Sequence, residues 1–136
     1  MKKLSIPVMM LCLGLATVAS AATGQIKFER WNNITGTAVN NLTDNAAYPD
    51  NPSEVTFVDQ FLANPAEDPS DYGGRLIGWL FPPVTGQYTF WIASDDNSQL
   101  WLSPDADHDN AFQIASVSGY TGINQWNKYD SQRSDL

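Results

Sequence analysis

Short apolar segments separated by clusters of turn residues are the feature that most limits what this chain can form. Candidate strands occupy residues 26–31, 55–61, 75–81, 86–94, 99–103 and 112–117. Between them lie YPDNPS, NPAEDPSDYGG, PPVTG and SPDADHDN, which are rich in Pro, Gly, Asn, Asp and Ser. No window shows a long run of helical periodicity. We therefore expect a single all-β domain of antiparallel strands.

The strongest strand signal is YTFWIA at residues 88–93, where both faces of the alternating pattern are apolar. A strand that is apolar on both faces is typical of a closed barrel or of two packed sheets. The fold class expected is therefore an antiparallel β-barrel or sandwich. Trp79 and Trp91 lie inside candidate strands and are expected in the core.

The segment LFPPVTGQYTF predicts a hairpin between residues 75–81 and 87–94. Its two prolines end the first strand because they lack backbone donors, and Gly86 lets the chain turn. A second turn, ASDDNS, then leads into strand 99–103 as another hairpin. The tip of this meander carries two adjacent carboxylates.

The N-terminal residues have the composition of a secretory signal peptide. Lys2 and Lys3 precede an apolar run, and Ala-Ser-Ala at 19–21 is a small-residue cleavage signature. Cleavage would leave a domain of residues 22–136, secreted or held at the cell surface, with no membrane insertion. The apolar run is too short to span a bilayer comfortably.

The mature chain would be strongly acidic and free of disulfides. Removing Lys2 and Lys3 changes the formal charge from −8 to −10, and the single cysteine, Cys12, leaves with the signal. Nucleic acid and anionic membrane surfaces are therefore unexpected partners. Cations and sugars are compatible with this charge.

The segments YGGRLIGWLFPPVTGQYTFWIASDDNSQLWLS and IASVSGYTGINQWNKYDSQRS resemble the domain named for the fourteen-kilodalton fragment of bacterial protective antigen. The resemblance covers residues from about 24 to 134. It implies a β-barrel module of the kind found in exported glycosidases, adhesins, toxins and cell-surface proteins, many of which bind carbohydrate. It also implies that the chain stops before the last strands of the domain, so we expect it to be C-terminally incomplete with open sheet edges.

In sugar-binding members of that family, two adjacent aspartates at the hairpin tip coordinate calcium, often through a cis peptide bond between them. Asp95 and Asp96 match this pair. Ca²⁺ prefers six to eight oxygen ligands, which two carboxylates supply in part and sugar hydroxyls can complete. Trp126, in the loop-rich GYTGINQWNKY, is the best candidate for an exposed ring that stacks on a sugar.

Alternatives remain open at the sequence level. Asp-Asp-Asn is also an ordinary turn, because short polar side chains bond the local backbone. The aspartates of DADHDN, residues 105–110, begin like a calcium loop, but Asn110 and Ser116 stand where that pattern requires Gly and Glu, which favours a solvated loop. His108 is the only histidine, and no carboxylate spacing singles out a glycosidase pair. We therefore expect no enzyme, with a structural or adhesive spacer as the alternative to a carbohydrate-binding module.

Overall fold

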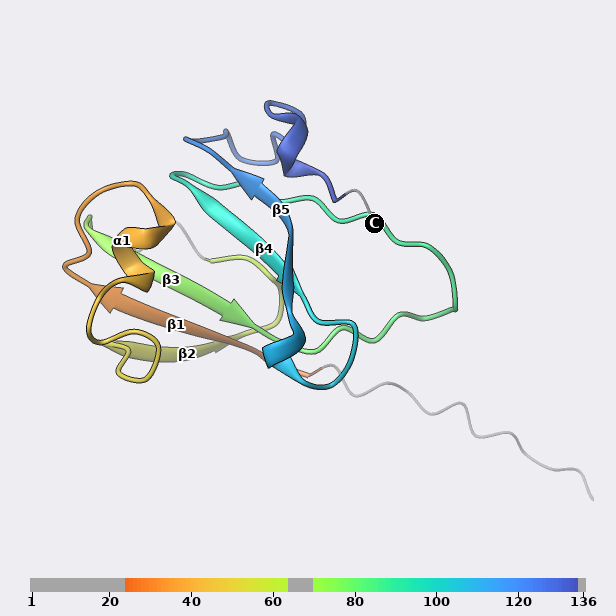
Figure 1. Cartoon of the computed structure of the whole chain (residues 1–136), viewed down its shortest axis with the longest axis horizontal. Coiled ribbons are helices and arrows are strands. Elements are labelled where there is room, and N and C mark those ends of the chain that lie inside the picture. The colour runs from red at the N-terminus through yellow and green to blue at the C-terminus, as the bar shows by residue number, and fades with distance from the viewer. Residues whose placement is uncertain (1–23, 64–69, 135–136) are drawn as a thin grey trace, which may run out of the picture.

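The computed structural model describes residues 24–63 and 70–134, so the expected signal peptide, residues 1–21, lies outside them. Three strands form one antiparallel sheet in the order β2-β1-β3: β1 is Ile26–Asn32, β2 is Glu54–Val58 and β3 is Tyr72–Ile77 (Figure 1). In the register of the sheet, Phe28 lies between Thr56 and Leu76.

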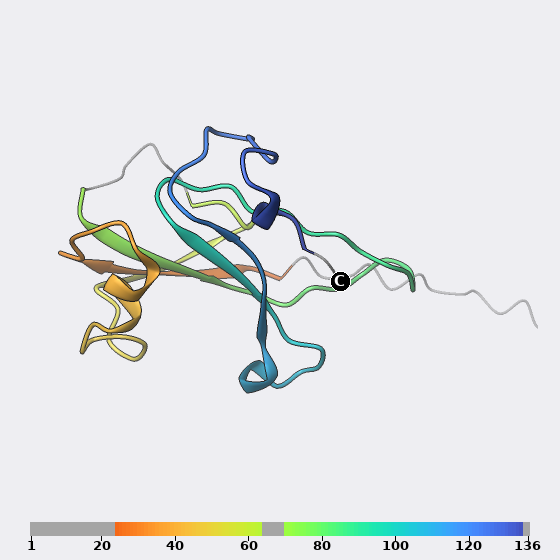
Figure 2. The same ribbon diagram turned by 45° about the horizontal axis from the view of Figure 1, so that its top comes forward.

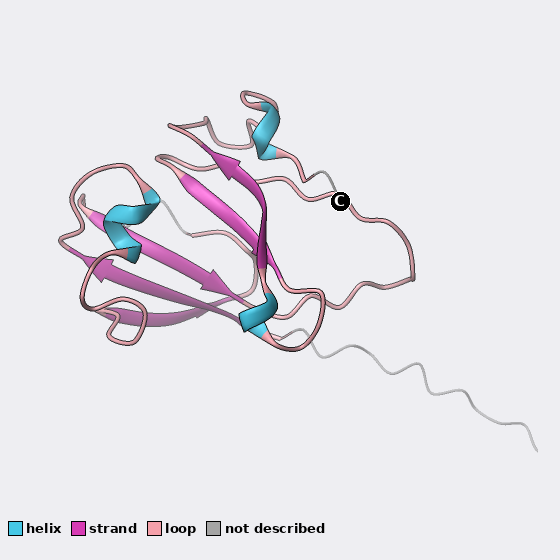
Figure 3. Ribbon diagram, in the orientation of Figure 1, coloured by secondary structure: helices cyan, strands magenta, loops and turns pink. Residues whose placement is uncertain are grey.

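A second antiparallel sheet consists of β4, Ser98–Leu102, and β5, Phe112–Val117. Its register shifts between Leu100 and Trp101, and the connection between the strands contains the 3-10 helix His108–Asn110. Figure 3 shows how little helix accompanies these strands. The expected all-β antiparallel class is confirmed, with the described residues arranged as two sheets rather than a closed barrel.

The best-packed region lies on the three-stranded sheet beneath a short helix, α1, Val39–Thr43. Trp31, Ile34 and Leu42 form a buried cluster against which Ala47 and Tyr48 pack. The indole Nε1 of Trp31 donates a hydrogen bond to the Ala47 carbonyl at 3.1 Å, so the buried ring leaves no polar atom unpaired. This cluster fixes the loop of residues 33–53 on one face of the sheet.

Glu29 is a carboxylate buried in the same sheet. Lys27 Nζ lies 2.7 Å from its Oε1, and Arg75 Nε donates to its Oε2 at 2.7 Å. Burial alone raises the pKa of Glu29, but hydrogen bonds and charge from Lys27 and Arg75 outweigh it and hold the pKa below its ordinary value. The pairing is what makes a charge tolerable at this depth.

The expected strand 86–94 and its hairpin with residues 75–81 are wrong. No strand is present between β3 and β4, and residues 78–94 form a long loop that projects away from both sheets (Figures 1 and 2). The inner part of this loop instead bonds the end of the described chain: Ile92 N–H donates to the Gln132 carbonyl and Ser134 N–H to the Phe90 carbonyl. Trp91 forms only an isolated antiparallel bridge with Arg133, a partner that local alternation could not determine.

The expectation that Trp79 and Trp91 are core residues is also wrong. Trp79 is 68% exposed and Trp91 49% exposed. Neither sheet covers the projecting loop, so Trp79, Phe81 and Val84 stay largely exposed. Alternation of apolar residues shows which side chains share a face, but not whether a second layer exists to bury that face.

Candidate functional site

The turn that leads into β4 brings the two aspartates together. Ser94 Oγ donates to the Asp96 carbonyl at 2.6 Å and lies 2.6 Å from Ser98 Oγ, which closes the turn across its base. Asp95 forms an isolated antiparallel bridge with Tyr120. The peptide bond between Asp95 and Asp96 is cis, as the family resemblance implies.

Both carboxylates of this turn are exposed. Among residues 24–63 and 70–134, neither accepts a hydrogen bond or forms an ion pair, so all four oxygens can meet a ligand. Hard oxygen ligands of this kind suit Ca²⁺, and two carboxylates supply up to four of the six to eight that it needs. The residues present therefore fit part of a calcium shell, which Asp95 and Asp96 would hold.

Other oxygens close to the turn already have partners. Asn97 Oδ1 accepts from Gly119 N–H at 2.7 Å, and the Tyr120 carbonyl accepts from Lys128 Nζ at 2.6 Å. The rest of a calcium shell would therefore come largely from water or from the ligand. A site of this type is open to an incoming polyhydroxylated molecule.

An aromatic hollow lies on the same segment, a few residues before the turn. Thr89, Phe90, Trp91 and Trp126 line a space of about 390 Å³. Trp126 is 46% exposed, so the predicted exposed ring is present, and Trp91 joins it although the sequence placed Trp91 in the core. Two partly exposed indoles offer the flat apolar surfaces on which sugar rings stack.

Gln132 positions Trp126 and was missed by sequence reasoning. Its side chain is fully buried: Oε1 accepts from the N–H groups of Lys128 and Tyr129, both at 2.8 Å. Its Nε2 donates to the carbonyls of Ile92 at 2.9 Å and Gln125 at 2.7 Å. One amide thus ties the loop that carries Trp126 to the segment that carries Trp91.

Thr121 ties the loop that follows β5 to Ser94, at the C-terminal end of the segment that carries Trp91. Its Oγ1 accepts from Ser94 N–H at 2.9 Å, and its own N–H donates to the Ser94 carbonyl at 2.7 Å. Single polar residues in a loop-rich region carry no pattern, so no sequence signal singled out Thr121 or Gln132. Only the fold shows that both are buried and fully bonded.

In the acidic loop at 105–110, the carboxylate of Asp105 accepts hydrogen bonds from within the loop. Asp105 Oδ1 accepts from Asp107 N–H at 2.8 Å, and the amide of Asn110 donates to both carboxylate oxygens of Asp105. These bonds, the backbone one first, hold the pKa of Asp105 below its ordinary value. Asp107, His108 and Asp109 can bring ligand atoms within 4.8 Å of one another, but all three are exposed, as in the solvated loop expected from sequence.

Comparison with known proteins identifies the class of domain. The PA14 domain family matches residues 33–129, and the chain belongs to that family. A curated mouse protein, N-acetyl-beta-glucosaminyl-glycoprotein 4-beta-N-acetylgalactosaminyltransferase 1, is 33% identical over 115 residues, which cover 82% of this chain but only 11% of that protein. No solved structure matches.

Membership in the PA14 family indicates the general role of the domain. PA14 domains are in general carbohydrate-binding or adhesion modules, are non-catalytic in many proteins and occur in extracellular proteins. In the part of the chain that the structure describes, no helix is long and apolar enough to cross a membrane. The carboxylate turn and the aromatic hollow lie on one segment of this domain.

Proposed function

We propose that this chain is an exported, non-catalytic glycan-binding module in which calcium at Asp95 and Asp96 assists sugar binding. The observation that carries the proposal is the exposed pair of carboxylates with no partner in the described chain, on the segment that also borders the aromatic hollow. An ordinary turn would not require two adjacent negative charges, which repel each other unless a cation or solvent relieves them.

The two features divide the work of binding. Calcium, when bound, would neutralise the carboxylates and accept sugar hydroxyls as ligands. Trp126 and Trp91 stack on the apolar face of a ring, while Gln132 holds the two indoles in place. Trp91 and Asp95 are four residues apart, at most about 14 Å along an extended chain. A ligand longer than one sugar reaches both.

Charge and relationship suggest the first ligands to test. The formal charge of the chain after signal cleavage, −10, disfavours anionic polysaccharides, so neutral glycans are the expected class. The name of the mouse relative refers to N-acetyl-beta-glucosaminyl glycoproteins. Glycans ending in N-acetylglucosamine are therefore the first choice.

A glycan array probed with and without a calcium chelator tests the proposal. We expect binding to neutral glycans that the chelator abolishes. Trp126→Ala should weaken binding at least about tenfold, because stacking in a partly buried site is worth more than 1 kcal/mol. Trp79→Ala is the matched control: Trp79 is more exposed and lies outside the hollow, so binding should not change.

The alternatives give different results. A structural or adhesive spacer would bind no glycan under either condition. Turnover of chromogenic glycosides would contradict the non-catalytic part of the proposal. Export is tested separately by N-terminal sequencing of secreted protein, which should begin at Ala22; an intact Met1 on cytoplasmic protein would reject it.

A further inference from the structure

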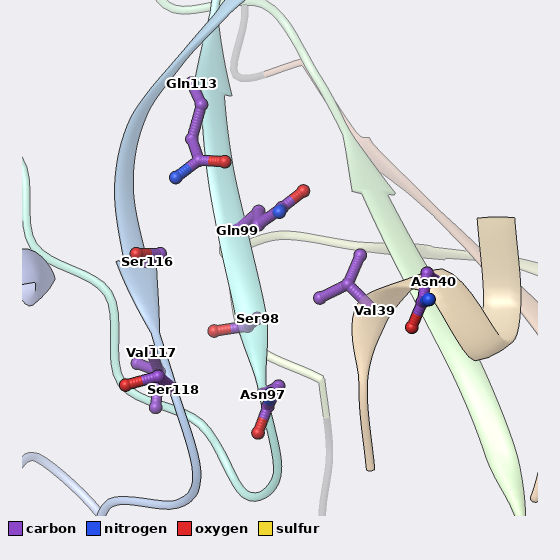
Figure 4. A pocket seen from close by; sticks show the side chains of 9 residues that line it. All are labelled: Val39, Asn40, Asn97, Ser98, Gln99, Gln113, Ser116, Val117 and Ser118. Carbon is purple, nitrogen blue, oxygen red and sulfur yellow. The ribbon is translucent and has the colours of Figure 1, made fainter. Parts of the chain in front are cut away.

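A groove lies between α1 and the β4–β5 sheet, next to the carboxylate turn at Asn97. It encloses about 300 Å³, and its wall comes from α1, the start of β4 and both ends of β5 (Figure 4). Figure 4 shows Gln99 extending from β4 toward Val39 of α1, with Gln113 farther along the groove. None of its residues lines the aromatic hollow.

The lining of the groove is polar but carries no charge. Four primary amides contribute to it: Asn40, Asn97, Gln99 and Gln113. Three serine hydroxyls and two valines complete it. In a chain with 15 acidic residues, a lining without a single ionisable group selects against ions and suits a neutral ligand.

Much of this polar lining is available to a ligand. Within the described residues, no hydrogen bond engages the side chains of Asn40, Gln113 or Ser118, and Gln99 uses only its Oε1, which accepts from Trp101 Nε1 at 3.2 Å. Each free amide offers two donors and two acceptor lone pairs. Vicinal hydroxyls of a sugar both donate and accept, so amides that face them can be satisfied in pairs.

The position of the groove relates it to the carboxylate turn. Asn97 follows Asp96 directly, and its Oδ1 accepts from Gly119 N–H, next to Ser118 at the same end of the groove. One end of the groove therefore begins where the proposed calcium site ends. A chain of sugars bound at the turn can continue along β4 toward Gln113.

We infer that this groove is a second saccharide subsite, which binds an uncharged sugar unit of an oligosaccharide whose neighbouring unit lies at the Asp95–Asp96 turn. The inference rests on the proposed function and extends it: the module recognises at least two units of a neutral glycan. Asn40, Gln99 and Gln113 bind the hydroxyls, and Val39 contacts the apolar face of the ring.

Nuclear magnetic resonance of the side-chain amides tests this directly. The calcium-loaded protein is titrated in parallel with chitotetraose, maltotetraose and tetragalacturonate. We expect at least one neutral tetrasaccharide to shift the side-chain NH₂ signals of Asn40, Gln99 and Gln113, and the anionic one to leave them unchanged. If neither neutral probe shifts these signals, or if tetragalacturonate shifts them equally, the inference is wrong.

Affinity measurements with variants separate this subsite from the turn. Gln113→Ala should lower the affinity for the neutral tetrasaccharide that binds by about five- to tenfold and leave the affinity for its monosaccharide unchanged. Gln87 is an exposed glutamine outside the groove, so Gln87→Ala should change neither affinity. Ser118→Trp, which fills the groove from an exposed bend, should lower the tetrasaccharide affinity as Gln113→Ala does.

The outcomes distinguish the subsite from the calcium site. Unchanged tetrasaccharide affinity in both groove variants, with binding still lost on chelation, overturns the subsite alone. Binding that survives chelation but needs the groove overturns the calcium proposal instead.

Discussion

Single polar residues hold the proposed site together. Gln132 makes four hydrogen bonds from a fully buried side chain, and Thr121 ties Ser94 to the loop that follows β5. Neither residue would contact a sugar. Their effect on binding passes through the position of Trp126 and of the turn.

Gln132→Ala is expected to lower the free energy of unfolding by about 2 kcal/mol. Two N–H groups and two carbonyls lose their partner at once, and those that water cannot reach stay unsatisfied. Chemical denaturation measures the change. As the control, Gln87→Ala should change the free energy of unfolding by no more than about 0.5 kcal/mol. An equally small effect of Gln132→Ala would show that the hydrogen bonds of the Gln132 amide do not anchor the loop.

Glu29 makes stability depend on pH. Its folded-state pKa is lowered, so its stabilising contribution is present above the ordinary carboxyl pKa and is lost as the pH falls through the folded value. The melting temperature of Glu29→Gln should therefore be lower than that of the parent near neutral pH, and the difference between the two should disappear at acidic pH. Thermal melts from about pH 7 to about pH 3 measure it. A gap that is constant across this range would contradict the ion-pair account.

At the scale of elements, the close approach of α1 to β3 depends on a residue without a side chain. A Cβ at Gly73 would lie 2.9 Å from two carbons of Leu42, which is itself buried in the core cluster. Packing therefore explains the first glycine of YGG, Gly73.

Gly73→Ala should destabilise the domain by roughly 1–3 kcal/mol, because the Leu42 side chain and the helix must shift to relieve the overlap. Gly86→Ala provides the control: no atom lies within 4 Å of its Cβ position, so its melting temperature should match the parent. Equal melting temperatures for both variants would mean that α1 does not pack on β3 as described.

The sequence predicted the positions of strands better than it predicted which segments pair with each other. Strands 26–31, 55–61, 99–103 and 112–117 are present with small shifts in their ends, because alternation and turn chemistry are local. Strand 86–94 failed because pairing is not local: Phe90 and Ile92 bond Ser134 and Gln132, which are about forty residues away and show no strand pattern. The site divides in the same way. A local motif and a resemblance pointed to Asp95 and Asp96, whereas Trp91 and Gln132 required the fold.

The whole molecule carries an unusual amount of exposed aromatic surface for an acidic protein. Four tryptophans, at 79, 91, 101 and 126, are between 46% and 68% exposed, and Trp31 alone is buried, at 1%. Three of the four belong to the hollow proposed to bind sugar or to the projecting loop next to it. The surface is consistent with a module that works by contact with another molecule.

Acrylamide quenching of tryptophan fluorescence checks this arrangement. We expect most of the emission to be accessible, with a minor protected component from Trp31. Trp79→Phe should reduce the accessible component without lowering the melting temperature, because that ring packs against little. A mostly protected emission would show that the projecting loop is covered in solution.

The proposed function depends on calcium binding at Asp95 and Asp96, and titration calorimetry measures that binding. We expect binding heat in the parent, no binding heat in Asp96→Ala with the fold retained, and unchanged heat in Asp109→Ala, which removes a carboxylate from the one cluster among the described residues that can bring three ligand atoms together. A parent that takes up no calcium, or a signal lost in Asp109→Ala but kept in Asp96→Ala, would contradict it.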